Sequence, residues 1–202
     1  MTNLEKIKDW LPIGYLYLVI LGMLKESIFF YQLGIGVVRY STIQDILLSP
    51  VADVVSEPVV FAGIVFVLLI VFLSMRVLSG ILVKKSMRKR TEEQDPEEVR
   101  KAARQKVSVL LNGALAFGVL CFFVGAGLGA GIKTRNRIEN NRMEFRHRVS
   151  FGTGETEEIF LIESNSAYCF YISKGGKNIK IAPMGAIKSL ELIVNRKLGQ
   201  KD

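Results

Sequence analysis

Hydrophobic residues gather in three long blocks of this chain, and polar residues fill the stretches between and after them. The most uniform block lies between Lys106 and Lys133, where 26 residues carry no charge. About 20 apolar residues are enough to cross a hydrocarbon core of roughly 30 Å. A soluble helix of this length would need a polar stripe, which is missing here. The pattern therefore predicts a transmembrane helix over residues 107–132.

The two earlier blocks predict further transmembrane helices over residues 11–31 and 59–83. Between them, Ser41 followed by Gln44 has the form of a capping box, and apolar residues then recur at helical spacing. We expect a short amphipathic helix over residues 41–55 that lies in the membrane interface. A lid packed over the helix bundle is the alternative. The fold class is thus a membrane all-α domain, residues 1–132.

Two elements flank the third predicted span. Asp95 followed by Pro96 is a strong helix start, so residues 96–106 are predicted to extend the third span outside the bilayer. After Glu144 the apolar period becomes alternating, which predicts a small all-β domain over residues 144–195, an SH3-like barrel or a meander. Its core is thin, so we expect it to rest on the membrane helices or on a neighbouring subunit. The expected strands are 144–151, 158–163, 167–173, 177–182 and 186–194.

Charge distribution predicts the topology. The formal net charge is +8, and nine Lys and Arg residues lie between the second and third spans, against Arg39 alone between the first two. The positive-inside bias favours a cytoplasmic N-terminus and an external C-terminal domain, in a bacterial inner (plasma) membrane. A basic group after the third span, from Lys133 to Arg148, acts against this orientation. Anionic lipid head groups are the expected partners of the first basic cluster: Lys84, Lys85, Arg88, Lys89 and Arg90.

Small residues follow one face of the third span, at steps of four, three, four and four: Ala114, Gly118, Cys121, Gly125 and Gly129. Helices in lipid commonly adhere through such stripes, because small side chains let two backbones come close. The stripe predicts a packing face, either against another span of the same chain or against the same helix in a second copy. We expect the second arrangement, a homo-oligomer.

Three polar residues lie inside the predicted spans: Lys25, Glu26 and Asn112. Adjacent helix positions point about 100° apart, so Lys25 and Glu26 are predicted not to pair with each other. We expect Lys25 to extend toward the nearby membrane surface and Glu26 to face the bundle. The alternative is a buried carboxylate that serves ion passage or partner recognition. Asn112 could line a pore or bond across helices.

Candidate catalytic and ligand-binding residues are few. His147, the only histidine, stands between two arginines on an expected strand and is predicted to be an exposed polar residue. No cysteine, histidine or carboxylate spacing matches a metal site, and the glycine-rich stretches lack the strand-to-helix context of a phosphate loop. The sequence predicts neither an enzyme nor a cofactor or metal. The basic charge comes without a nucleic-acid-binding motif, so no nucleic-acid partner is predicted.

The sequence therefore favours a non-enzymatic integral membrane protein that self-associates through the third span. It would act as an accessory or scaffold subunit, or as a membrane effector of a signalling or defence system, with a β domain that senses a ligand or binds a protein partner. The alternative is a homo-oligomeric channel whose polar path uses Lys25, Glu26 and Asn112. Residues 33–50 resemble a motif in their density of turn and cap residues, without indicating an activity.

Overall fold

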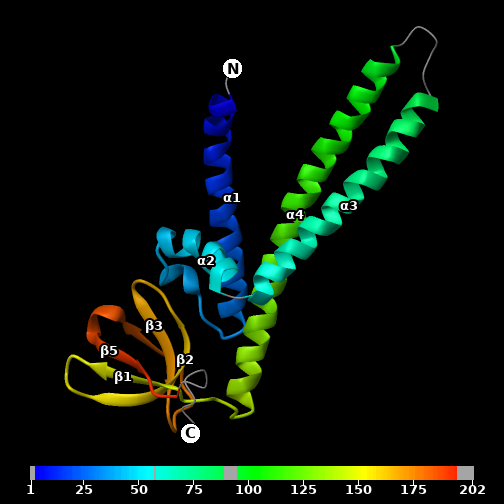
Figure 1. The fold of residues 1–202 in the computed structure, drawn as a ribbon. Coiled ribbons are helices and arrows are strands. Elements are labelled where there is room, and N and C mark those ends of the chain that lie inside the picture. The colour runs from blue at the N-terminus through cyan, green and yellow to red at the C-terminus, as the bar shows by residue number, and fades with distance from the viewer. Residues whose placement is uncertain (1–2, 57, 89–94, 195–202) are drawn as a thin grey trace. The chain divides into compact units, whose positions relative to one another are not determined.

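The structure, a computed structural model, describes residues 3–56, 58–88 and 95–194, and for residues 3–10, 86, 87 and 96 it describes the backbone alone. In this part of the chain, four α-helices are followed by an antiparallel sheet (Figure 1). The chain forms two compact units. The first unit combines residues 1–50 with 126–202, and the second contains residues 51–125.

Three of the described helices are long and apolar enough to cross a membrane. The apolar part of the first runs from Leu11 to Tyr31, as predicted, and the second and third also contain the predicted spans. The prediction of three such helices is therefore confirmed in length and composition. They are α1 (Asn3–Tyr31), α3 (Pro58–Arg88) and α4 (Pro96–Glu139).

The two ends of α4 have different outcomes. At its start, the backbone N–H of Glu97 donates to Oδ1 of Asp95 at 3.0 Å, so the predicted cap is confirmed. Its end was predicted at Ile132, but the helix continues to Glu139. Polar residues prolong a helix until a residue adopts another conformation, and here Asn141 has a left-handed φ of 52°.

The short helix α2 (Ile43–Ser56) begins two residues later than predicted. Its capping box is formed by Thr42 and Asp45: Thr42 Oγ1 accepts the Asp45 N–H at 3.2 Å, and Asp45 Oδ2 accepts the Thr42 N–H at 3.1 Å. The capping box predicted one residue earlier is therefore wrong. The hydroxyl of Ser41 instead donates, at 3.2 Å, to a carbonyl of the preceding 3₁₀ turn η1 (Val37–Arg39).

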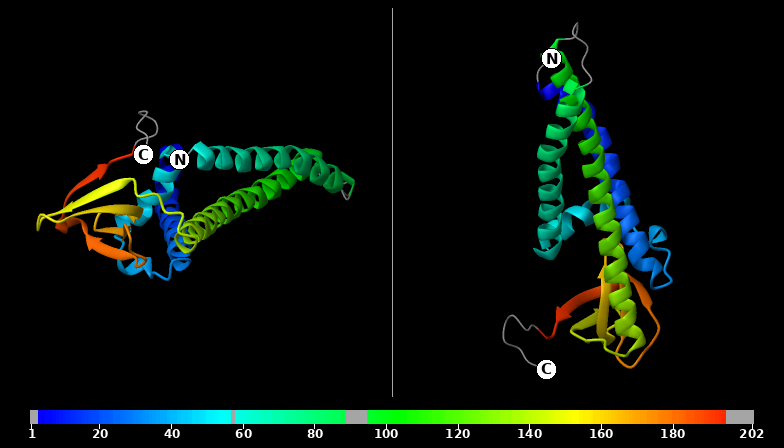
Figure 2. Two further views of the ribbon diagram at one scale, coloured as in Figure 1. Left: turned by 90° about the horizontal axis from the view of Figure 1, so that it is seen from below. Right: turned by 90° about the vertical axis from the view of Figure 1, so that its right-hand side faces the viewer.

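The C-terminal domain is a five-stranded antiparallel sheet with the strand order β4-β3-β2-β1-β5. All five expected strands are present, with shifted ends. A closed barrel would require β4 to pair with β5, but these strands form the two edges, so the barrel alternative is wrong and the sheet is open (Figure 2). The strands are β1 (His147–Phe151), β2 (Thr156–Ser164), β3 (Tyr168–Ser173), β4 (Lys180–Pro183) and β5 (Ile187–Leu192), with a 3₁₀ turn η2 (Met184–Ala186) before the last.

The first unit has two hydrophobic cores, one on each face of β3. On one face, Phe170 packs with Phe29 and Phe30 of α1 and with Val37. On the other face, the sheet curls around a second group: Val149, Ile159, Cys169 and Tyr171. The β domain thus shares a core with the end of α1, which is the first of the two supports expected from its small size.

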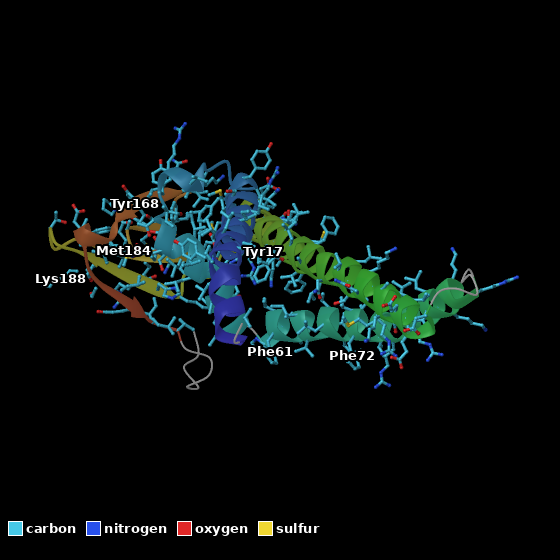
Figure 3. The ribbon with its side chains drawn as sticks, turned by 90° about the horizontal axis from the view of Figure 1, so that it is seen from above. Tyr17, Phe61, Phe72, Tyr168, Met184 and Lys188 are labelled. Carbon is cyan, nitrogen blue, oxygen red and sulfur yellow. The ribbon has the colours of Figure 1, made fainter. Side chains whose placement is uncertain are left out.

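The second unit pairs α3 with the first part of α4. The two helices run antiparallel, because Gly63 lies against Phe122 and Val67 against Gly118. A Cβ atom at position 63 would lie 2.4 Å from the Phe122 ring, so glycine permits this approach. No residue in the apolar window of α3 is buried, and Phe61 and Phe72 point away from the helix (Figure 3). Such a surface is expected of a helix that lies in lipid.

Candidate functional site

The helices α1 and α2 meet at Gly22. A Cβ atom there would lie 1.8 Å from the carbonyl oxygen of Ile46 and 3.2 Å from Cδ of Pro50, so only glycine allows this contact. Ile46 and Pro50 are buried, whereas Ile43 and Leu48 expose 65% and 59% of their surface. One side of α2 therefore packs on α1, and an apolar part of its remaining surface is exposed.

A polar cluster joins the same two helices. Ser49 of α2 donates to Oε1 of Glu26 at 2.5 Å, and Nζ of Lys25 lies 3.3 Å from both that Oε1 and the Ser49 hydroxyl. The Lys25 and Glu26 side chains are only 16% and 15% exposed. The prediction that these two residues do not pair is therefore wrong. The long, flexible lysine side chain turns toward its neighbour, where the serine hydroxyl completes a three-membered cluster.

The last part of α4 packs on α1 through two glycines that lie outside the predicted small-residue stripe. A Cβ atom at Gly127 would lie 2.6 Å from the carbonyl oxygen of Lys25, and one at Gly131 would lie 2.8 Å from that of Phe29. Because both pairs advance by four residues, α1 and α4 run parallel. The backbones approach closely here, as small residues allow in membrane helices.

The predicted small-residue stripe lies on another side of α4. At Gly125 and Gly129 an added Cβ would have no atom within 4 Å, and Ala114 and Cys121 are exposed. Of the three glycines in the stripe, only Gly118 has a neighbour within 4 Å of an added Cβ, namely Val67 Cγ1 at 3.5 Å. Residues two positions apart on a helix point about 160° from each other, which places Gly125 and Gly129 away from the side that Gly127 presents to α1. The stripe remains a predicted oligomer face.

The other predicted site residues lie on exposed surfaces. Asn112 is exposed on α4, and Lys84, Lys85 and Arg88 are exposed near the end of α3. Lys89 and Arg90 lie outside the described residues. The proposed roles of these residues, in pore lining and in lipid head-group binding, stay predictions.

Aromatic rings hold the β domain against the first helix. The ring centroids of Phe30 and Phe170 are 4.7 Å apart, and those of Tyr40 and Tyr168 are 5.3 Å apart. Phe30 is 1% exposed and Phe170 is completely buried. Burial of two phenylalanines stabilises this contact by several kcal/mol, on the order of 1.5–3 for each side chain. The sheet is therefore docked firmly on the end of α1.

Hydrogen bonds fix the same contact from the side of α2. Asp45 accepts the Ser166 backbone N–H at 3.1 Å and the Ser166 hydroxyl at 2.8 Å, and Asn165 Nδ2 donates to the carbonyl of Tyr40 at 3.0 Å. Partial burial acts to raise the pKa of Asp45, but the hydrogen bonds from Thr42 and Ser166 outweigh it and hold that pKa below its usual value. Residues 33–50, which looked like a motif, are thus the segment that joins α1, α2 and the sheet.

A shallow hollow of about 410 Å³ lies in the β domain, lined in part by Phe151, Glu155 and Tyr171. Glu157 at its margin accepts the Ser173 hydroxyl at 2.5 Å and pairs with Lys180 at 3.0 Å. The Ser173 hydrogen bond and, after it, the Lys180 charge outweigh partial burial and lower the pKa of Glu157. Its carboxylate is thus ionised and already engaged at neutral pH.

The side chains that could take part in a reaction, namely the two cysteine thiols and His147, form no common site among the described residues. Burial raises the pKa of the Cys169 thiol, which disfavours the reactive thiolate, whereas Cys121 is exposed. Burial, and then the charge of Arg146, lower the pKa of His147, which is half-buried rather than exposed as predicted. Among the described residues, no three His, Cys, Asp or Glu side chains come together as metal ligands would.

No protein-family model, curated protein or solved structure matches this chain at a significant level. The arrangement of its own residues is therefore the basis for a functional proposal. The contact residues that sequence reasoning missed are Gly22, Ser49, Gly127, Gly131 and Ser166. Their only visible signal was small size, because each acts through a contact with a segment distant in the sequence.

Proposed function

We propose that this chain is a non-enzymatic integral membrane protein in which the β domain is fixed to the first transmembrane helix. It acts as an accessory or scaffold subunit, or as the membrane effector of a signalling or defence system. The observation that supports this proposal is the shared core of Phe30 and Phe170. A partner or ligand that displaces the sheet would also disturb α1 and α2, so binding outside the bilayer would reach the membrane helices.

Self-association through the small-residue stripe is the second part of the proposal. It is supported by the exposure of Ala114, Cys121, Gly125 and Gly129, which leaves this side of α4 open to a second copy. In this arrangement the Cys121 thiols of two copies would lie close together near the contact. The chain therefore carries its own cross-linking probe, because the other thiol, Cys169, is buried.

Oxidative cross-linking in native membranes tests this contact. We expect a disulfide-linked dimer of the unaltered chain, and a much weaker one when the thiol is moved in a Cys121→Ser, Ala116→Cys variant. Ala116 is also exposed, and five helix positions place it about 140° from residue 121. Equal cross-linking of the unaltered chain and the variant, or no cross-linking of either, would show that the two copies do not meet through the stripe.

The proposed orientation puts the N-terminus and the basic residues before α4 in the cytoplasm of a bacterium, and the β domain outside the plasma membrane. Lys84, Lys85 and Arg88 would then contact anionic head groups of the inner leaflet. Protease digestion of intact spheroplasts tests on which side of the membrane the β domain lies. The β domain should be cleaved by protease added outside, and its protection would show the opposite topology. The channel alternative has its own test in liposomes, namely ion flux that Glu26→Gln or Gly125→Leu abolishes.

A further inference from the structure

We infer that on the side of the β domain the hydrocarbon core ends at the level of Lys25, Glu26 and α2, and not at Tyr31 where the apolar run ends. In this arrangement α2 lies in the boundary of that leaflet and presents apolar side chains to the lipid acyl chains. The last turn of α1 lies at the level of the lipid head groups, where it packs in the hydrophobic core of the β domain. The inference rests on the proposed function, because it assumes that α1 crosses a membrane.

The first argument is what covers the end of α1. Phe29 and Phe30 are 7% and 1% exposed, and they pack with Phe170 of the sheet. A sheet with open edges and polar turns is not tolerated in hydrocarbon, because lipid leaves its backbone groups without partners. The α1 residues packed on this sheet therefore lie beyond the acyl chains.

The second argument is the division of α2 into a polar and an apolar side. Asp45 accepts hydrogen bonds from Ser166 in the turn between β2 and β3, and Ser49, one helical turn later, donates to Glu26. Ile43 and Leu47 are each two positions from Asp45 and so point about 160° away from it. Their side of α2 faces away from the β domain, and Ile43 is 65% exposed there. The helix α2 therefore has a polar side toward the β domain and an apolar side away from it. A helix with two such sides is suited to lie in the plane of a lipid–water boundary.

The third argument is the length of α4 that would lie within the hydrocarbon core. Gly127 of α4 touches the backbone of Lys25, so these residues lie at one level. Along α4, Lys106 is 21 residues before Gly127, which corresponds to about 31 Å and matches a hydrocarbon core of roughly 30 Å. A boundary at Ile132 would give about 39 Å between the flanking positions. The shorter distance fits the bilayer without tilt or local thickening.

The same boundary accounts for the polar cluster. With the boundary at Tyr31, Lys25 would lie about 9 Å inside the hydrocarbon, where a charged group is costly. At the level of α2, Lys25 and Glu26 pair at the edge of the head-group layer, with Ser49 as the third member. On the other side of the membrane, Lys8 lies 17 residues before Lys25, which corresponds to about 26 Å along the helix, so a lysine stands at each end of this span.

Single-tryptophan variants in phosphatidylcholine and phosphatidylglycerol vesicles test the boundary. Trp10 is the only tryptophan, so Trp10→Phe gives a silent background. Into it we would place Ile20→Trp, Met23→Trp or Tyr31→Trp, at positions that are 40%, 39% and 79% exposed. Each emission is quenched once by lipids with brominated acyl chains and once by acrylamide in the water.

We expect the tryptophans at 20 and 23 to be quenched by brominated lipid and protected from acrylamide. The tryptophan at 31, about 12 Å further along α1 than position 23, should show several-fold stronger acrylamide quenching and little bromine quenching. Equal protection at 23 and 31 would overturn the inference while leaving the membrane proposal standing. Acrylamide access at position 20 would refute membrane crossing by α1 itself.

Two further variants test α2 and guard against misfolding. Ile43→Trp should be quenched by brominated lipid, and access to acrylamide equal to that at position 31 would show that α2 lies in water. Val38→Trp, at a position 51% exposed in the segment after α1, should behave like Tyr31→Trp. This variant tests the same position of the hydrocarbon boundary if Tyr31→Trp does not fold.

Discussion

Replacing Gly22 by alanine should separate α2 from α1. The added Cβ would lie 1.8 Å from the carbonyl oxygen of Ile46, which is a backbone atom and cannot rotate away. A Cβ atom in ordinary van der Waals contact lies at least 3.4 Å from its neighbour, so α2 would have to move by roughly 1.6 Å. A shift of that size also breaks the 2.5 Å hydrogen bond between Ser49 and Glu26.

The expected cost follows from these two effects. Overpacking in a well-packed contact costs about 1–3 kcal/mol. Loss of a hydrogen bond to a charged group adds about 1.5–3 kcal/mol. Alanine in place of glycine returns up to about 1 kcal/mol of helix propensity. Together these ranges give a fall of about 1.5–6 kcal/mol in the free energy of unfolding for Gly22→Ala.

The chain offers a matched control in the same helix. Gly14 has no atom within 4 Å of an added Cβ, so Gly14→Ala should leave the free energy of unfolding unchanged or raise it by up to about 1 kcal/mol. Both variants would be made in a Cys121→Ser background. Unfolding by a denaturing detergent would be followed through the reaction of the buried Cys169 thiol with a maleimide.

The contrast between the two variants decides the outcome. Gly22→Ala should expose Cys169 at a lower detergent fraction than the parent chain, and Gly14→Ala should not. If both variants unfold together with the parent, the close approach of α2 to α1 does not exist in the folded protein. The packing argument for the polar cluster would then fail as well.

Three further measurements address other contacts. Phe170→Ala should lower the free energy of unfolding by about 3–5 kcal/mol, because it removes a completely buried ring. Phe117→Ala, at a position 68% exposed, should change it little, and an equally small change for Phe170→Ala would show that the docked core is not stabilising. Because the pKa of Asp45 is lowered in the folded state, its contribution to stability is present above the unfolded pKa of about 4 and is lost as the pH falls through the folded pKa. Asp45→Asn should therefore weaken the loss of stability at acid pH. An unchanged pH dependence would contradict the hydrogen bonds between Asp45 and Ser166. In a Cys121→Ser background, the Cys169 thiol, which is buried with a raised pKa, should react with a maleimide at least 10-fold more slowly in the native fold than after unfolding by a denaturing detergent. Equal rates would show that the sheet core opens readily.

Local sequence signals predicted several elements because their causes lie within a few residues. An uncharged run of apolar residues gives a long apolar helix whatever its neighbours are. Asp95 caps α4 through its own next turn, and the alternating pattern after Glu144 places five strands. The end of α4 was misplaced because loss of hydrophobicity at Ile132 is not a signal that ends a helix. The cap of α2 was misplaced because Ser41 and Thr42 are both suitable residues, and the 3₁₀ turn before them decides between the two.

Composition and periodicity alone thus determined that this chain has three helices long and apolar enough for a membrane, followed by a small β domain. Only the tertiary structure decided which small residues of α4 meet a neighbour, since Gly125 and Gly127 differ in direction and not in chemistry. It also decided that Lys25 and Glu26 pair, because the hydroxyl that joins them comes from Ser49, 23 residues further along the chain. Contacts of this kind depend on how close distant segments come to each other in space, and a residue's type and its immediate neighbours carry little information about that distance.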